Sequence, residues 1–244
     1  MHSLSLQAAI IDLDGTMIDT MGDFELALNR MLADFGYAGV ERSFIERTVG
    51  KGSEHLVRST LDFVQNRPMA QGNAAQAAMN TVVSNVDLDA AMRSYQTHYL
   101  AVNGQASAVY AGVVQGLEQL RATGLLLACL TNKPTAFALP LLKAKGLDGY
   151  FGHVFGGDAF ARKKPDPLPL LKTCEALGTA PARTLMVGDS SNDAQAARAA
   201  GCPIALVSYG YNHGQPVRSV PADWYVDSLG QLAGLLGFGL PGAV

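Results

Sequence analysis

Five short apolar runs, each followed by turn residues, constrain the fold of this chain most strongly. They occupy residues 8–13, 125–130, 184–187, 203–207 and, more weakly, 224–226. A continuous apolar run is stable as a strand when helices cover both faces of its sheet, as in parallel sheets. Helical patterns lie between the runs, at residues 113–122, 136–144, 168–177 and 193–200. The alternation predicts an α/β fold with a doubly wound, Rossmann-like parallel sheet.

The interval between the first two runs is too long for a simple connection. It spans roughly a hundred residues, whereas a crossover between parallel strands needs one helix and two short loops. Its apolar residues recur at a spacing of three to four, which predicts helices around residues 24–35, 56–64, 74–83 and 88–100. We therefore expect a helical cap domain at residues 20–102, inserted into a core domain made of residues 1–19 and 103–244.

Charge and cysteine content narrow the classes of function. The chain has 18 Lys and Arg residues and 21 acidic residues, which gives a formal charge of −3. It contains no dense run of basic residues. This charge distribution excludes the basic surface typical of nucleic-acid-binding proteins and a polybasic membrane-binding patch. We therefore expect a small molecule as the partner. The three cysteines lack metal-ligand spacing and are expected to be reduced. With no signal-peptide core and no apolar run long enough to span a bilayer, we expect a cytoplasmic protein.

The first apolar run ends at two aspartates one residue apart, in the segment "AAIIDLDGT". Residues two apart on a strand point to the same face, so Asp12 and Asp14 crowd each other at the carboxyl end of the strand, where open α/β sheets bind ligands. A hard divalent cation such as Mg²⁺ takes oxygen ligands and offsets that crowding. Gly15 permits a sharp turn that can point the two carboxylates in different directions. One carboxylate can therefore bind the metal while the other faces the substrate.

The segment "DLDGT" resembles the first motif of the haloacid dehalogenase superfamily, whose members are mostly phosphatases acting through an aspartyl-phosphate. Three further motifs resemble the rest of the superfamily's pattern and follow in the same order. "LLLACLTNKP" supplies Thr131 and Asn132, "ARKKPDPLPLL" supplies Lys164, and "TLMVGDSSNDAQAA" supplies Asp189 and Asp193. Each motif stands at an expected strand end or helix start, which favours one shared site over four unrelated turns.

The resemblance implies a division of labour among these residues. Asp12 is expected to attack phosphorus, and Asp14 to protonate the leaving oxygen and then activate water. The hydroxyl of Thr131, the backbone N–H of Asn132 and the ammonium of Lys164 are expected to hold the phosphoryl oxygens.

The resemblance also implies a Mg²⁺ site. The carboxylates of Asp12 and Asp189 and the backbone carbonyl of Asp14 are the expected ligands, and Asp193 is expected to orient metal-bound water or Lys164.

Within the superfamily the motifs are most similar to those of the phosphoglycolate phosphatase branch. "GDSSNDAQAARAAGCP" and the segment "YGYN" at residues 209–212 carry most of that similarity. The loop "RTVGKGSEH" holds Gly50 and Lys51 where the branch has its cap loop, and these residues, with Arg47 as a second cation, are the candidates for binding the substrate. The implied reaction is hydrolysis of 2-phosphoglycolate or a related phosphorylated acid.

Three alternatives remain open from the sequence. A phosphosugar mutase would retain Asp14 but bind an acceptor hydroxyl and exclude water. A dehalogenase would have no task for a general acid at Asp14, and a non-catalytic binding module would lack a core motif, although none is absent. Each short motif, taken alone, is also compatible with ordinary turn, cap or surface chemistry. The chain is expected to be a monomer or a homodimer.

Overall fold

The computed structural model describes residues 6–66 and 86–237. Six parallel strands form its central sheet, in the order β5-β4-β1-β6-β7-β8. The strands are β1 (Ala8–Ile11), β4 (Leu126–Leu130), β5 (His153–Phe155), β6 (Thr184–Gly188), β7 (Ile204–Val207) and β8 (Trp224–Val226). The predicted α/β class is confirmed, and β1 lies inside the sheet between β4 and β6.

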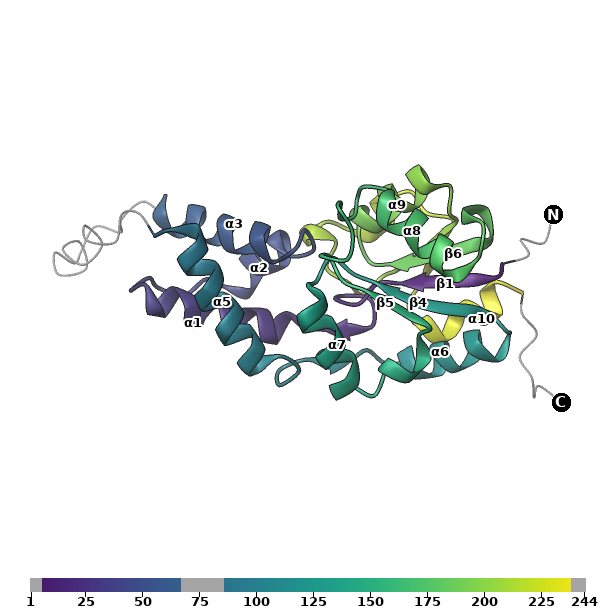
Figure 1. Cartoon of the computed structure of the whole chain (residues 1–244), viewed down its shortest axis with the longest axis horizontal. Helices are drawn as coiled ribbons and strands as arrows, with labels where there is room; N and C mark the ends of the chain where they lie inside the picture. Colours follow the sequence, from purple (N-terminus) through teal and green to yellow (C-terminus); the bar gives the residue numbers. More distant parts are fainter. Residues whose placement is uncertain (1–5, 67–85, 238–244) are drawn as a thin grey trace.

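Helices cover both faces of this sheet, as Figure 1 shows for α8 and α9 above it and α6, α7 and α10 below it. Alternate strand residues explain the arrangement, because successive side chains point to opposite faces. Ala9 and Ile11 of β1 pack with one group of helices, while Ala8 and Ile10 pack with the other. The helices are α6 (Val113–Ala122), α7 (Thr135–Ala144), α8 (Leu168–Leu177), α9 (Ser191–Ala200) and α10 (Leu232–Leu235).

The edge strand β5 was not predicted from the sequence. It is three residues long, contains a histidine and is only half-buried, so it has no continuous apolar run. It pairs with β4 through Val154 opposite Cys129.

The strand order reverses between β1 and β6: the chain adds β4 and β5 on one side of β1, and then β6, β7 and β8 on the other. In open α/β sheets, ligands usually bind in the crevice beyond the carboxyl ends of the strands at such a reversal.

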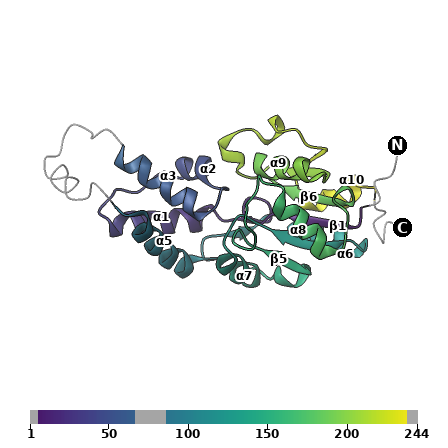
Figure 2. The ribbon, with the colours of Figure 1, turned by 45° about the horizontal axis from the view of Figure 1, so that its top comes forward.

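Between residues 20 and 107, the part of the chain that the structure describes contains four helices, which form a separate layer at one end of the molecule, best seen in Figure 2. They are α1 (Met21–Asp34), α2 (Arg42–Thr48), α3 (Ser53–Gln65) and α5 (Leu88–Val102). Their apolar faces enclose a hydrophobic core of their own, with Leu28, Tyr95 and Tyr99 fully buried. The helix predicted at residues 74–83 lies outside the described residues. We refer to α1, α2, α3 and α5 as the helical layer.

Two short chain segments connect this helical layer to the sheet. They pair as antiparallel strands β2 (Ile18–Asp19) and β3 (Ala108–Val109). The buried carboxylate of Asp23 accepts hydrogen bonds from the backbone N–H groups of Gly104 (2.8 Å) and Ala106 (2.7 Å). The entering and leaving chains are therefore fixed to each other beside the sheet. Across residues 6–66 and 86–237, the structure contains no helix with the length and apolar character to cross a bilayer.

Candidate active site

The two aspartates of the first motif diverge as they leave β1. Asp12 continues the sheet, and its backbone N–H donates to the carbonyl of Val187 on β6 at 2.9 Å. Gly15 has a φ of +81°, in the left-handed region that suits glycine, and its N–H donates to the carbonyl of Ile18. On either side of this turn the two carboxylates have different partners, Lys164 for Asp12 and Lys133 for Asp14.

Lys164 lies between two buried carboxylates. Its Nζ is 3.0 Å from Oδ1 of Asp12, 2.7 Å from Oδ1 of Asp193 and 2.9 Å from the carbonyl of Leu130. Burial lowers the pKa of Lys164, but the two carboxylates outweigh burial and raise it above its ordinary value. Burial raises the pKa of Asp12 to about 7, against the lowering effect of the lysine. Lys164 is thus a permanent buried cation beside the predicted nucleophile.

Asp193 occupies the first turn of α9 and has two sets of partners. Its Oδ2 accepts hydrogen bonds from the backbone N–H (3.2 Å) and hydroxyl (2.8 Å) of Ser190, which completes a capping box at the helix start. Its Oδ1 accepts from Lys164. One carboxylate therefore both caps α9 and pairs with Lys164.

Asp189, at the end of β6, faces Asp12. Oxygen atoms of Asp12, Asp189 and Asp193 lie within 4.8 Å of one another, a group that could hold a metal ion. A Cβ at Gly15 would approach Oδ2 of Asp189 to 2.3 Å, so the glycine leaves room for this carboxylate. Burial and the nearby carboxylates of Asp193 and Asp12 hold the pKa of Asp189 well above its ordinary value. Crowded hard oxygen donors of this kind fit a divalent cation.

Thr131 and Asn132 follow β4 and are buried beside these carboxylates. The amide of Asn132 donates to the carbonyls of Lys164 (2.8 Å) and Gly50 (3.0 Å), and its Oδ1 accepts from the N–H of Lys164 at 3.0 Å. The Asn132 side chain therefore holds the loop that carries Lys164. It also joins that loop to Gly50 of the helical layer.

Sequence reasoning missed Lys133, the next residue of the same motif. Its Nζ lies 2.9 Å from Oδ1 of Asp14 and 2.6 Å from the hydroxyl of Tyr99 on α5. The rings of Phe24 and Tyr99 each lie 4.7 Å from this ammonium. The side chain of Lys133 is 2% exposed. Adjacency to Thr131 and Asn132 was the available signal, whereas the approach of α1 and α5 is a tertiary effect that the sequence does not display.

The "YGYN" segment contributes to the site, as the sequence suggested. The N–H of Tyr211 donates to Oδ2 of Asp189 at 2.7 Å. The hydroxyl of Tyr211 donates to Asp19 at 2.9 Å and accepts from the N–H of Thr20 at 2.7 Å. Tyr211 therefore ties the Asp189 carboxylate to the start of the helical layer.

A cavity between the sheet edge and the helical layer brings these residues together. Its lining includes every predicted core-motif side chain, together with residues that sequence reasoning did not select: Phe24, Leu56, Lys133, Phe137, Asn192 and His213. Gly50 and Gly52 also line it, and Gly50 accepts a second hydrogen bond from Asn192 at 3.1 Å. Lys51, between them, is exposed and is not among the lining residues. Arg47 is likewise exposed and outside the lining.

The predicted metal ligands fall into two kinds. Asp12 and Asp189 belong to the crowded carboxylate group, whereas the carboxylate of Asp14 is paired with Lys133 and lies outside it. The ligand expected from Asp14 is its backbone carbonyl, and this remains a prediction.

Comparison with known proteins assigns the family. The profile of the haloacid dehalogenase-like hydrolases matches residues 9–207. The chain belongs to this family. The match covers all four motifs and the whole helical layer, in agreement with the resemblance found in the sequence.

Two curated relatives resemble the chain over nearly its full length. A phosphoglycolate phosphatase of Thiobacillus denitrificans is 41% identical over 230 residues, covering 94% of this chain and 95% of the relative. A phosphoglycolate phosphatase of Nitrosospira multiformis is 42% identical over 226 residues, with 93% of each covered. The chain is accordingly an enzyme of this family, a phosphoric monoester hydrolase.

A solved structure supports the fold. The crystal structure of a predicted phosphoglycolate phosphatase from Haemophilus somnus superposes with a TM-score of 0.85 at 28% identity, covering 95% of this chain and 98% of the other. The helical layer and the sheet are thus both included in the likeness.

Proposed function

We propose that this enzyme is a Mg²⁺-dependent phosphatase of a small phosphorylated organic acid, 2-phosphoglycolate, acting through an aspartyl-phosphate on Asp12. The observation that carries the proposal is the meeting of Asp12, Asp189 and Lys164 in one cavity, with Asp14 on the adjoining turn. The names of the curated relatives support the choice of substrate.

The carboxylate of Asp12 attacks phosphorus, and the bond between phosphorus and the ester oxygen breaks. Lys164 faces the attacking carboxylate and offsets negative charge on the phosphoryl oxygens. The Thr131 hydroxyl and the Asn132 backbone N–H, at the carboxyl end of β4, hold the same oxygens. Asp193 fixes the position of Lys164 through the 2.7 Å ion pair.

Asp14 handles the protons of both half-reactions. In the first it donates a proton to the departing alkoxide oxygen, and in the second it accepts one from the water that attacks the aspartyl-phosphate. Its carboxylate is 13% exposed and opens on the cavity, and the turn at Gly15 separates it from Asp12. The released products are the alcohol and inorganic phosphate, and Asp12 is regenerated.

The cluster of carboxylates from Asp12, Asp189 and Asp193 fits a Mg²⁺ ion. Asp12 and Asp189 would hold it with the Asp14 backbone carbonyl, while both oxygens of Asp193 are already engaged by Lys164 and Ser190. A bound divalent cation supplies charge that favours the ionised form of Asp12 and offsets repulsion between nucleophile and phosphate.

We further propose that residues 20–102 act as a cap over the site. Hydrogen bonds from Asn132 and Asn192 to the carbonyl of Gly50 join this layer to the sheet edge in the described state. Closure of such a layer excludes water from a reacting phosphoryl group. The cap-loop assignment of substrate binding to Gly50 and Lys51 stays a prediction.

A phosphate-release panel tests this function. The purified enzyme is assayed with 2-phosphoglycolate, a hexose phosphate and a neutral alkyl phosphate, with Mg²⁺ and with excess chelator. We expect preferential release from 2-phosphoglycolate that the chelator abolishes. Interconversion of hexose phosphates without net phosphate release would favour the mutase alternative and overturn the proposal.

A further inference from the structure

Lys133 differs from Lys164, the other lysine of the cavity lining, in the oxygens that its ammonium contacts. Among the described lining residues the lysines are Lys133 and Lys164. The ammonium of Lys164 donates to Oδ1 of Asp193 and to the carbonyl of Leu130, and it lies 3.0 Å from Oδ1 of Asp12. Lys164 is thus engaged with the predicted nucleophile and with Asp193.

The ammonium of Lys133 contacts a different set of oxygens. Its described oxygen contacts are the carboxylate of Asp14, at 2.9 and 3.2 Å to the two oxygens, and the hydroxyl of Tyr99 at 2.6 Å. The ammonium also lies 4.7 Å from the ring centroids of Phe24 and Tyr99. Lys133 lines the cavity, where a buried ammonium can pair with an incoming carboxylate through a charge-assisted hydrogen bond.

The position of Lys133 relative to the reacting atoms determines which part of the substrate it can reach. Asp14 lies two residues after Asp12 in the sequence and carries the proton for the leaving oxygen in the proposed mechanism. A group attached to that oxygen must lie close to Asp14, and Lys133 is in contact with Asp14. Lys133 is therefore the lysine of the described cavity lining that contacts Asp14, on the side of the cavity that would receive the substituent of the leaving alcohol.

From these contacts we infer that Lys133 binds the carboxylate of the substrate's leaving group and so selects phosphorylated acids over neutral phosphate esters. The inference rests on the proposed phosphatase function and deepens it. Phe24 and Tyr99 exclude water around the ammonium, which strengthens its pairing with a carboxylate. Lys51, the cation expected from the sequence, is exposed and outside the cavity lining.

The test compares two substrates that differ in one charge. 2-Phosphoglycolate and its amide, 2-phosphoglycolamide, have the same size and the same leaving oxygen. We expect wild-type kcat/KM to favour the acid, and Lys133→Met to lower kcat/KM for the acid by on the order of 10- to 100-fold relative to the amide. Because the same folded molecules hydrolyse both substrates, the ratio is independent of the fraction of active protein.

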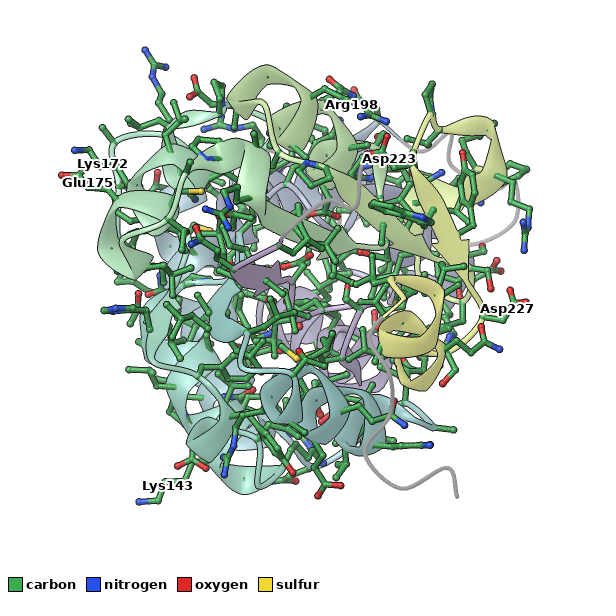
Figure 3. All side chains as sticks on the ribbon, turned by 90° about the vertical axis from the view of Figure 1, so that its right-hand side faces the viewer. Lys143, Lys172, Glu175, Arg198, Asp223 and Asp227 are labelled. Carbon is green, nitrogen blue, oxygen red and sulfur yellow. The ribbon has the colours of Figure 1, made fainter. Side chains whose placement is uncertain are left out.

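Two further variants sharpen the comparison. Lys172→Met removes an exposed lysine on α8 that pairs with Glu175, and Figure 3 shows both residues at the periphery of the sheet end of the molecule. It should leave the acid-to-amide ratio unchanged. Lys133→Gln, which can still hydrogen-bond Tyr99, should reproduce the loss and supplies the measurement if the Met variant fails to fold.

The outcomes separate this inference from the proposed function. If the wild type hydrolyses acid and amide equally, the proposed substrate class is wrong. If the wild type prefers the acid and Lys133→Met lowers both substrates equally, Lys133 only supports Asp14, and the inference is overturned. Loss of the ratio in Lys51→Ala, with retention in Lys133→Met, would overturn it in favour of the cap loop.

Discussion

The ammonium of Lys164 lies 3.0 Å from Oδ1 of Asp12, and both residues are buried at the carboxyl edge of the sheet. Asp193 approaches the same ammonium from the other side at 2.7 Å. The enzyme thus carries a compensating charge for its nucleophile within the folded protein. This charge is present before any substrate arrives.

Replacing this lysine should cost stability as well as activity. Lys164→Met leaves two buried carboxylates without their cation, and breaking a buried ion pair in this way typically costs about 3–5 kcal/mol. Urea denaturation at neutral pH in excess chelator measures the free energy of unfolding. Lys172→Met, at an exposed pair, should change it by less than about 0.5 kcal/mol. Equal stability of the two variants would contradict the assigned role of the buried pair.

Asp14→Asn should lower turnover selectively. The nucleophile and the Asp14 backbone carbonyl survive the substitution, so the loss falls on proton transfer, on the order of 10²- to 10⁴-fold for an alkyl phosphate. An aryl phosphate whose leaving group needs no proton should suffer less in formation of the aspartyl-phosphate. Burst kinetics with both substrates measure this difference. Unchanged turnover of the alkyl phosphate would exclude Asp14 as the acid.

The cluster of Asp12, Asp189 and Asp193 should link metal binding to the stability of the fold. Mg²⁺ that binds only the folded protein raises its stability by mass action, by about 2.7 kcal/mol at a hundredfold excess over Kd. We therefore expect Mg²⁺ to raise the melting temperature of the wild type. Asp189→Asn should abolish most of this rise, while relieving repulsion among Asp12, Asp189 and Asp193 in the metal-free protein. An equal Mg²⁺ response in both proteins would show that the ion binds elsewhere.

The metal-free protein should lose stability as pH rises from about 4 through 7. Burial raises the pKa of Asp12 to about 7, and that of Asp189 is also raised, so the folded state retains protons that the unfolded chain has released. Where the folded state binds more protons, the free energy of unfolding falls with rising pH. Melting curves in chelator at pH 5 and pH 8 test this. In Asp189→Asn the decline should be shallower, and a rise in wild-type stability across this window would contradict the assignment.

The core of the fold was predictable because its strands are continuous apolar runs. The predicted strands at β1, β4, β6, β7 and β8 are confirmed, whereas β5 has only three half-buried residues and gives no periodic signal. Tertiary pairing with β4, rather than local composition, defines it.

Whether a site residue could be predicted also depended on whether its position shows in the local sequence. Those at strand ends were predictable, since parallel strands bring their carboxyl ends to one edge. Partners supplied by the helical layer were not: Tyr99 reaches Lys133 from α5, and Phe24 from α1. Lys51 was selected because it lies between two glycines, but that local pattern does not determine whether the side chain faces the cavity.

The proposed mechanism forms a covalent intermediate on Asp12, and quenched-flow mass spectrometry can detect it. During turnover of 2-phosphoglycolate, stopped with acid, a fraction of the wild-type chain should carry one phosphoryl group, and borohydride should convert residue 12 to homoserine. Asp12→Asn should show neither the adduct nor turnover, because an amide is not an adequate nucleophile. Recovery of a phosphorylated chain from Asp12→Asn, or of full turnover without any adduct at residue 12 in the wild type, would show that Asp12 is not the nucleophile.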